Sequence, residues 1–279
     1  MRKHITSVVA LLATLSTGAF AQSAGLLTPI DSDLELSATV ELGMIGVYSN
    51  VLQQGQNGTA FEYVTQGGQD ILFRFARASV ELGWRNRHSV VLLIQPLDVR
   101  TQALLDEDII VDGLTFPSGT AMDLRYGFDF YRLSYLFDLL PEPERELAIG
   151  VSLQVRDASI SFASQAGDLF RITQDVGPVP ILKARGRAEF GSTFVGFEVD
   201  GFYADGRYIS GSTNDFIGAI VDASLRGGIL LRNGFEAFLN LRYLGGGARG
   251  VEENDPEPGD GFTDNWLHAG ALTVGVTVR

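Results

Sequence analysis

The chain has 279 residues and no cysteine, so an exported domain of this size would fold without a disulfide bond. No cysteine is available as a lipid acceptor either. Beyond the first residues, no stretch approaches the roughly 20 consecutive apolar residues that a membrane-spanning helix needs. Basic residues are also scarce, with 21 Lys and Arg against 34 Asp and Glu. Because nucleic acid requires a basic surface, we expect no nucleic-acid partner.

Proline is scarce at 9 residues, whereas glycine is abundant at 33 and follows no collagen-like period. This composition favours strands joined by glycine-containing turns over a low-complexity chain.

The first 21 residues have the organisation of a secretory signal peptide. Arg2 and Lys3 form a basic start, residues 5–15 form a short apolar run, and Ala19-Phe20-Ala21 is a small-residue cleavage site. We therefore expect residues 1–21 to be removed before Gln22. Residues 22–279 then form one exported domain.

A predicted hairpin over residues 179–203 shows how the strands are built. Apolar and charged residues alternate on both sides of Gly191-Ser192, which is a permitted two-residue turn. A turn at this point pairs Phe190 with Thr193. The same register sets Arg185 opposite Glu198, Lys183 opposite Asp200, and Phe197 over Gly186.

The same period-two alternation predicts ten strands along the chain. After Asn233-Gly234 a two-residue turn would mix the two faces, so we expect a three-residue turn over 232–234 that pairs Leu225 with Leu241. The ten expected strands are 34–48, 71–84, 88–97, 124–137, 147–162, 179–190, 193–203, 216–231, 235–244 and 266–279.

Long and short connections alternate between these strands. The expected long loops are 49–68, 98–123 (with a small hairpin at 111–114), 163–177, one around Asp205-Gly206, and 244–263. The other connections are short. This asymmetry is typical of an outer-membrane barrel with short periplasmic turns and long external loops. Aromatic residues near the strand ends fit two interfacial girdles: Tyr48, Trp84, Phe137, Phe190, Tyr203, Phe235, Tyr243 and Trp266.

On this alternation and loop asymmetry, residues 34–279 resemble bacterial outer-membrane β-barrel proteins. The resemblance implies outer-membrane lipid, lipopolysaccharide and the barrel-assembly machinery as partners. One feature departs from the class, because such barrels usually end in an aromatic residue and this sequence ends in Val278-Arg279.

In a membrane barrel the charged face of each strand lines the lumen. A barrel of about ten strands has little free bore, so long charged side chains would pair and fill it. A narrow polar or ion pathway is the alternative. The predicted lumen residues are Glu35, Glu41, Arg77, Glu81, Arg132, Arg156, Lys183, Arg185, Arg187, Glu198, Asp200, Asp222, Arg226 and Arg242.

Catalytic residues are not indicated by any motif. His88 lies in a short turn, and His268 shares the lipid-facing parity with Trp266. A pair of His268 with Asp264 or Asp260 at the external rim, or a lipid-modifying role for His268, is the enzymatic alternative. No cofactor is indicated.

Loop 245–263 is acidic. It carries Glu252, Glu253, Asp255, Glu257 and Asp260. Carboxylates suit hard divalent cations, so weak cation binding is an alternative to a solvated loop. The spacing matches no defined metal loop.

The sequence therefore predicts an all-β fold, a closed antiparallel up-and-down transmembrane barrel of 10 strands, with 8 or 12 as alternatives. We expect a non-catalytic outer-membrane protein with a charge-filled lumen and displayed loops. A small-solute channel, an external-rim or lipid-modifying hydrolase, and a soluble exported β-sandwich are the alternatives.

Overall fold

The computed structural model describes residues 34–140, 142–205, 216–251 and 259–279. The predicted signal peptide lies outside these residues. No helix among the described residues is long and apolar enough to cross a lipid bilayer.

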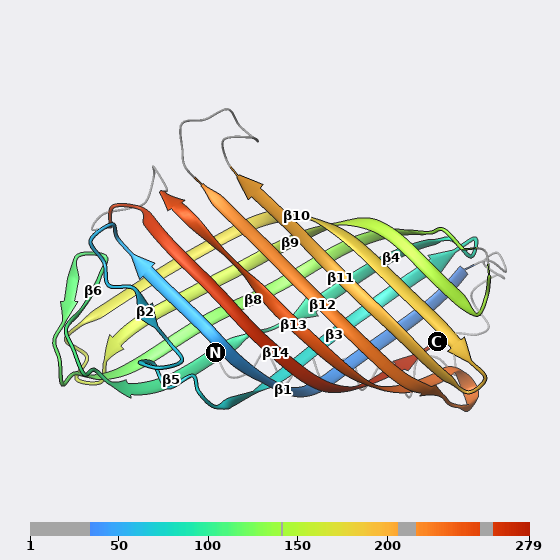
Figure 1. Cartoon of the computed structure of the whole chain (residues 1–279), viewed down its shortest axis with the longest axis horizontal. Coiled ribbons are helices and arrows are strands. Elements are labelled where there is room, and N and C mark those ends of the chain that lie inside the picture. The colour runs from blue at the N-terminus through green and yellow to red at the C-terminus, as the bar shows by residue number, and fades with distance from the viewer. Residues whose placement is uncertain (1–33, 141, 206–215, 252–258) are drawn as a thin grey trace, which may run out of the picture. The chain divides into compact units, whose positions relative to one another are not determined.

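Ten antiparallel strands form a closed barrel, as the sequence predicts (Figure 1). Each strand pairs with the next in the chain, and the last strand pairs with the first. The barrel strands are β1 (Leu34–Gln54), β3 (Leu72–Trp84), β4 (His88–Gln95), β8 (Ala121–Asp138), β9 (Arg145–Ser164), β10 (Phe170–Phe190), β11 (Thr193–Asp205), β12 (Ile217–Leu230), β13 (Phe235–Val251) and β14 (Phe262–Val278).

Smaller elements lie at the external end. Strand β2 (Phe61–Glu62) pairs with β1, and β5 (Asp98–Leu104) continues the wall beyond β4 by pairing with β8. Strands β6 (Ile109–Val111) and β7 (Leu114–Phe116) form the small hairpin expected at 111–114. A single 3-10 turn, η1 (Arg232–Gly234), joins β12 to β13.

The registers predicted for two hairpins are confirmed. In the first, Arg185 lies opposite Glu198, and Phe197 covers Gly186 so closely that an added Cβ would lie 2.2 Å from its ring. In the second, Leu225 pairs with Leu241 across the three-residue turn. Asn233 and Gly234 both adopt positive φ there, at 64° and 75°, which these two residue types tolerate.

Four expected loops are wrong in extent. The loop expected at 244–263 is shorter, because β13 continues to Val251 and β14 begins at Phe262. Residues 163–177 are mostly strand, because β10 begins at Phe170 and pairs with β9 along its whole length; the connection is short rather than long. Strand β1 continues to Gln54, past a bulge between Val47 and Ser49 that lets polar residues enter the barrel. Residues 98–104 pair with β8 as β5.

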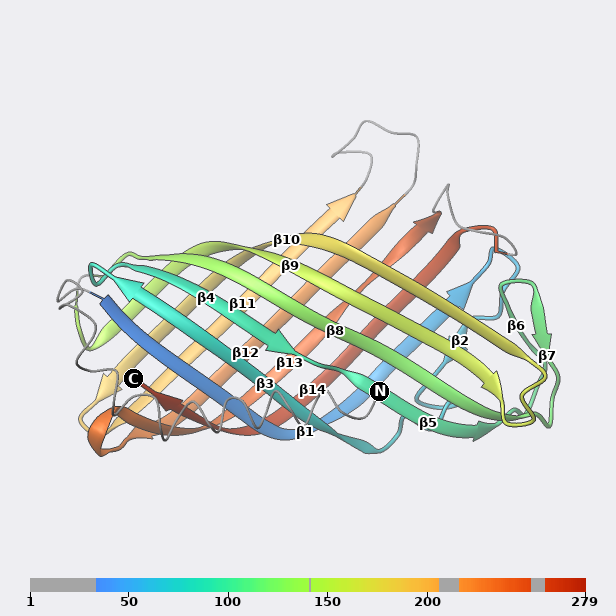
Figure 2. The ribbon, with the colours of Figure 1, turned by 180° about the vertical axis from the view of Figure 1, so that it is seen from behind.

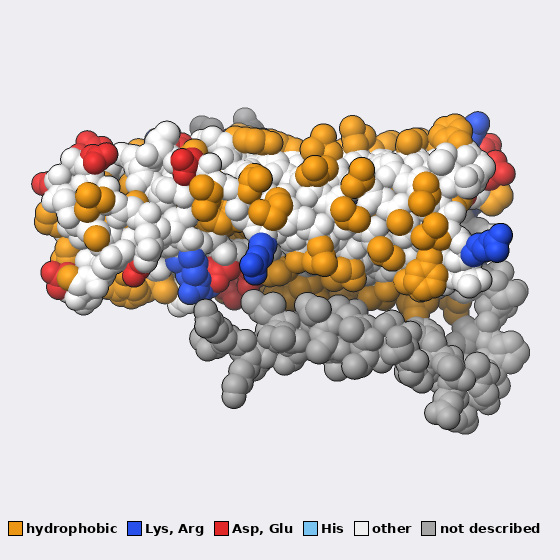
Figure 3. Space-filling model, turned by 90° about the horizontal axis from the view of Figure 1, so that it is seen from below, with side chains coloured by type: hydrophobic (Ala, Val, Ile, Leu, Met, Phe, Trp, Pro, Cys, Tyr) orange, Lys and Arg blue, Asp and Glu red, His pale blue; other side chains and the backbone are white. Residues whose placement is uncertain are grey.

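The outer surface of the barrel is apolar over most of the strands. Leu36 is 52% exposed and Val151 is 57% exposed, and both point away from the lumen. Figure 3 shows hydrophobic side chains over much of one face, with charged side chains over the left half and at the right-hand end. A surface of this kind is stable in lipid, and it supports the inverted architecture that the alternation predicts.

The apolar face changes sides along β8 and β9. Near the periplasmic turns, Leu133 and Tyr135 point outward. Toward the external end, Leu124 and Tyr126 of the same strand are buried inside, whereas Asp123 and Arg125 take the outward parity. The lipid-facing belt therefore ends near Asp129 and Asp157, which pair on β8 and β9. Beyond this level β8 and β9 have polar residues outside and apolar residues inside, whereas β10 keeps Phe170, Ile172 and Val176 on its outward face.

The external part of the wall is divided along two lines. Strands β10 and β11 pair only as far as Leu182 and Gly201, although β10 continues from there to Phe170 against β9. Strand β5 pairs with β8 and not with β3. The external half thus consists of one wall with β5, β8, β9 and β10 and a second wall from β11 to β3, as the two opposite views show (Figures 1 and 2).

Candidate functional site in the barrel lumen

At the level of the lipid belt, the lumen is filled by charged side chains around Asp222. Arg77 Nη1 lies 3.0 Å and Arg132 Nη1 3.1 Å from Asp222 Oδ2, and Arg242 pairs with the other carboxylate oxygen. The three arginines come from β3, β8 and β13, so one carboxylate ties together strands on different sides of the barrel. Arg132 and Arg242 are each 1% exposed.

A second centre surrounds Lys183, the one lysine among the described residues. Its Nζ lies 2.9 Å from Glu198 and 3.0 Å from Asp200. Asp200 Oδ2 also lies 2.8 Å from Arg132 Nη1, and this ion pair joins the charges around Lys183 to those around Asp222. Opposite charges at such distances offset the cost of removing each charge from water.

Toward the periplasmic turns the same chemistry continues with more exposed groups. Arg185 pairs with Glu81 at 2.7 Å and with Glu146 at 2.6 Å. Arg187 pairs with Glu236 at 2.9 Å. We call the whole set the lumen network. It has seven residues of each sign: Arg77, Arg132, Lys183, Arg185, Arg187, Arg226, Arg242, Glu41, Glu81, Glu146, Glu198, Asp200, Asp222 and Glu236.

Two of the fourteen residues predicted for the lumen lie elsewhere. Arg156 faces inward but pairs with Asp175, on the external side of the network. Glu35 is exposed at the start of β1. The prediction omitted Glu146, which lies one residue before the expected strand 147–162, and Glu236, which lies on the inward parity of the expected strand 235–244. It also omitted the buried amides of Gln154 and Asn240, which bind Arg132 and Glu41.

The lumen network leaves little free space. A cavity of about 40 Å³ lies among its members, lined by charged groups such as Arg77, Glu198 and Arg226. That volume accommodates on the order of one to three water molecules. The network therefore fills the bore as a plug of paired charges.

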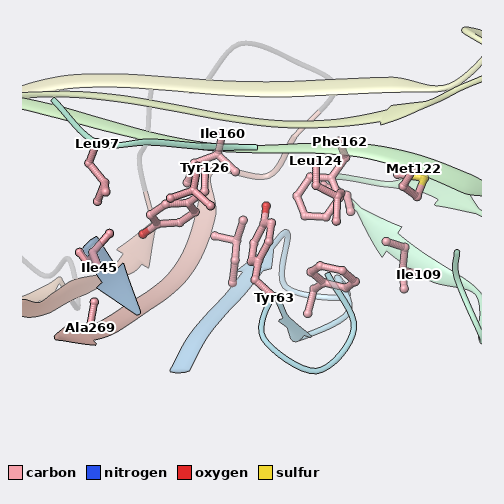
Figure 4. Packing of buried hydrophobic residues seen from close by; sticks show 14 of the residues in the cluster. Ile45, Tyr63, Leu97, Ile109, Met122, Leu124, Tyr126, Ile160, Phe162 and Ala269 are labelled. Carbon is pink, nitrogen blue, oxygen red and sulfur yellow. The ribbon is translucent and has the colours of Figure 1, made fainter. Parts of the chain in front are cut away.

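The external half of the lumen is filled by apolar side chains instead. They come from both walls, from the β6–β7 hairpin and from the loop after β1, and they are tightly buried (Figure 4). We call this set the outer cluster: Ile45, Leu52, Phe61, Tyr63, Phe75, Leu97, Val99, Leu105, Ile109, Val111, Phe116, Met122, Leu124, Tyr126, Ile160, Phe162, Leu244, Ala269 and Ala271. Burial raises the pKa of the Tyr63 hydroxyl well above its ordinary value and that of Tyr126 to about 12.

A cluster of this kind has no separate signal in the sequence, apart from the change of apolar parity within β8 and β9. Reading each strand as a single period hides that change.

Both described histidines lie on the outer surface. His268 Nδ1 is 2.7 Å from the Tyr243 hydroxyl, and the two rings are nearly stacked. His88 makes the same pair with Tyr135 at 2.8 Å and stacks on Trp84. His268 is therefore held by an aromatic neighbour on the lipid-facing side.

The aromatic residues predicted for the girdles are on the outward face. Tyr48 and Tyr203 are 68% and 64% exposed at the external side, and Phe190 is 63% exposed at the periplasmic side. Phe235, Tyr243, Trp84, Phe137 and Trp266 follow the same parity on their strands.

The acidic loop is described only in part. Residues 252–258, which carry Glu252, Glu253, Asp255 and Glu257, lie outside the described residues. Asp260 accepts hydrogen bonds from the backbone of Gln56 and Phe262. In the described part of the chain, no group of three or more His, Asp or Glu residues is arranged to hold a metal ion.

No family model matches the sequence, and no curated protein matches it significantly. The structure is similar to that of the outer-membrane protease OmpT from Escherichia coli, with a TM-score of 0.51 and 11% identity over 90% of this chain and 98% of that one. A FadL homologue from Pseudomonas aeruginosa gives 0.40 and 9%, over 88% and 90%. OprG from Pseudomonas aeruginosa gives 0.31 and 10%, over 87% and 96%. At 11% identity, the similarity to OmpT is evidence for a shared fold and for nothing more. Together with the apolar outer surface, it shows that this chain has the fold of an outer-membrane β-barrel.

Proposed function

We propose that the protein is a non-catalytic, non-conducting outer-membrane scaffold that displays its external loops. The observation that carries the proposal is the filling of the lumen. A neutral network of paired charges occupies the level of the lipid belt, and an apolar cluster occupies the level above it. An ion crossing the barrel would meet two barriers of opposite chemistry.

The positions of the histidines support the non-catalytic part of this proposal. A rim hydrolase would use His268 with a carboxylate such as Asp264 above the lumen. In the fold, His268 pairs with Tyr243 on the outward face, and Asp264 accepts the indole N–H of Trp266 at 2.7 Å. The two groups therefore have other partners.

Single-channel recording in planar lipid bilayers tests the proposal. We expect the wild-type chain to give no steady conductance steps. The double substitution R132S/D222S removes one cation and one carboxylate from the centre of the lumen network without changing the net charge, and it is expected to allow brief openings. Heat-dependent gel mobility verifies that both chains are folded. Steady open steps from the wild-type chain would overturn the proposal in favour of a small-solute channel.

A further inference from the structure

We propose that the external half of the lumen is a binding chamber for a small apolar molecule with one or two aromatic rings. In this structure two side chains of the chain itself, Phe61 and Tyr63, occupy the chamber. They belong to residues 55–70, the loop between β1 and β3, which we call the strap. This inference goes beyond the proposed scaffold role and does not depend on it.

The occupants pack on the chamber wall through their ring faces and edges. The Phe61 ring lies 5.5 Å from the ring of Phe162, and the Tyr63 ring lies 5.7 Å from the rings of both Tyr126 and Phe162. Ile45 and Ala269 line the opposite wall (Figure 4). A molecule with two aromatic rings could make the same ring-to-ring contacts with Tyr126 and Phe162.

One polar atom in the chamber has no partner. The Tyr63 side chain is fully buried, and among the described residues its hydroxyl finds no hydrogen-bond partner. An unpaired buried hydroxyl costs free energy, so the strap is bound in the chamber less tightly than its apolar contacts alone would predict. A ligand that has no polar group at this position, or whose polar group finds a hydrogen-bond partner there, avoids this free-energy cost. Such a ligand can therefore displace the strap from the chamber more easily.

The strap is attached in a way that allows release. Its strand β2 has two residues, and Glu62 accepts the Asn50 backbone N–H at 2.8 Å and the Ser49 hydroxyl at 3.0 Å. Three further backbone hydrogen bonds hold the strap, from Tyr63 to Asn50, from Thr59 to Ile110 and from Gly55 to Phe262, so release must break a small, countable set of contacts. Gly55 and Gly68, near its two ends, adopt φ of 84° and 73°. Only glycine takes such angles freely, so both are natural hinge positions.

The chamber can also widen without loss of strand pairing. Among the described residues, its two walls share no backbone ladder along the β10–β11 line beyond Leu182, nor along the β3–β5 line. Two side-chain hydrogen bonds cross between the walls, from the Tyr126 hydroxyl to Asn265 and from the Gln54 amide to Thr173, and widening would break them. Below it, the lumen network closes the way toward the periplasmic side. The chamber would therefore hold a ligand rather than pass it on.

A reversible clamp on the strap tests the inference. Val51 and Glu62 are directly paired on β1 and β2, and the chain has no native cysteine, so V51C/E62C introduces a single possible disulfide. Benzophenone is the probe, because it is a two-ring apolar molecule that inserts into nearby C–H bonds under ultraviolet light. Peptide mass spectrometry locates the insertion, and the same protein is compared oxidised and reduced.

We expect the wild type and the reduced variant to be labelled on the peptides that carry Tyr126 and Phe162. Oxidation should lower that labelling about tenfold, a change equivalent to roughly 1.4 kcal/mol. Labelling of the lipid-facing belt serves as the internal control and should not change. The variant F61A/Y63A, which vacates the chamber, should be labelled more strongly than the wild type.

Equal chamber labelling in the oxidised and reduced protein would overturn the inference, as would labelling confined to the lipid-facing belt. Heat-dependent gel mobility verifies the fold of each variant. If F61A/Y63A does not fold, the clamp comparison still decides the question. Failure here leaves the conductance result untouched, so the two proposals fail separately.

Discussion

Asp222 is the residue on which the lumen network depends most, since three arginines from different strands share its carboxylate. We expect D222N to destabilise the barrel by about 3–5 kcal/mol, because it leaves buried guanidinium groups without an anion. The measurement is the free energy of unfolding in urea in a detergent or lipid environment. The matched control is D123N at the exposed external end, expected to change stability by less than about 0.5 kcal/mol. Equal effects of the two substitutions would contradict this view of the network.

Lys183 offers a direct test of how well the plug excludes water. The sequence holds two lysines, Lys3 and Lys183, and Lys183 is 5% exposed. A water-soluble amine-reactive ester should leave Lys183 unmodified in the folded barrel and modify it after thermal denaturation in sodium dodecyl sulfate. Glu142→Lys places a control amine in an exposed periplasmic turn, and this amine should react in the folded protein. Modification of Lys183 at the rate of the control would mean that the lumen is open.

The tyrosines of the outer cluster predict a loss of stability in alkali. Burial raises the pKa of Tyr126 to about 12, above an ordinary value of about 10. The folded state therefore holds this proton more tightly than the unfolded state, so the contribution of Tyr126 to stability is fully present below about pH 10 and is lost as the pH rises toward 12. Unfolding titrations across that interval check the result. Y126F should show a weaker dependence, and an identical slope in both chains would refute the assignment.

At the scale of single elements, two prolines determine where β10 stops pairing with β11. Pro178 and Pro180 lie within the strand and pair with Val155 and Leu153 of β9. Proline has no N–H to donate, so its nitrogen must face the other edge, toward β11. This explains why the β10–β11 ladder ends at Leu182.

Replacing the prolines should therefore extend the ladder. In P178V/P180V, the existing register would bring residue 180 opposite Tyr203 and residue 178 opposite Asp205. Two restored donors should slow hydrogen exchange in the peptides around 178–181 and 203–205, as measured by mass spectrometry. Unchanged exchange in both peptides would show that something other than proline separates the strands.

The same elements show what the sequence could and could not predict. Alternation defines faces wherever one side meets lipid, so the strand pairs near the periplasmic turns, such as Arg185 with Glu198, were predictable by counting. The start of β10 was not, because Gly177-Pro178 resembles the end of a loop. The position of Phe61 and Tyr63 was not predictable either, since a loop residue reaches its packing partners through contacts that local periodicity does not encode.

At the scale of the whole molecule, one closed barrel carries two polarity patterns. Near the periplasmic turns the barrel has lipid outside and charge inside, whereas beyond Asp129 and Asp157 strands β8 and β9 have polar residues outside and apolar residues inside. The prediction of a closed ten-stranded membrane barrel is confirmed. The exchange of faces along β8 and β9 was not predicted, because each strand was assigned one apolar face along its whole length.

The change of sides on β8 and β9 also constrains how such a protein could be delivered to its membrane. The outward carboxylates of the external half have to pass the hydrocarbon layer before they reach water on the far side. A hydrophobic core completed beforehand would force a rigid, charged body through that layer. We therefore expect the strands to cross first and the rings around Tyr63 and Phe162 to come together afterwards, as the last step of maturation.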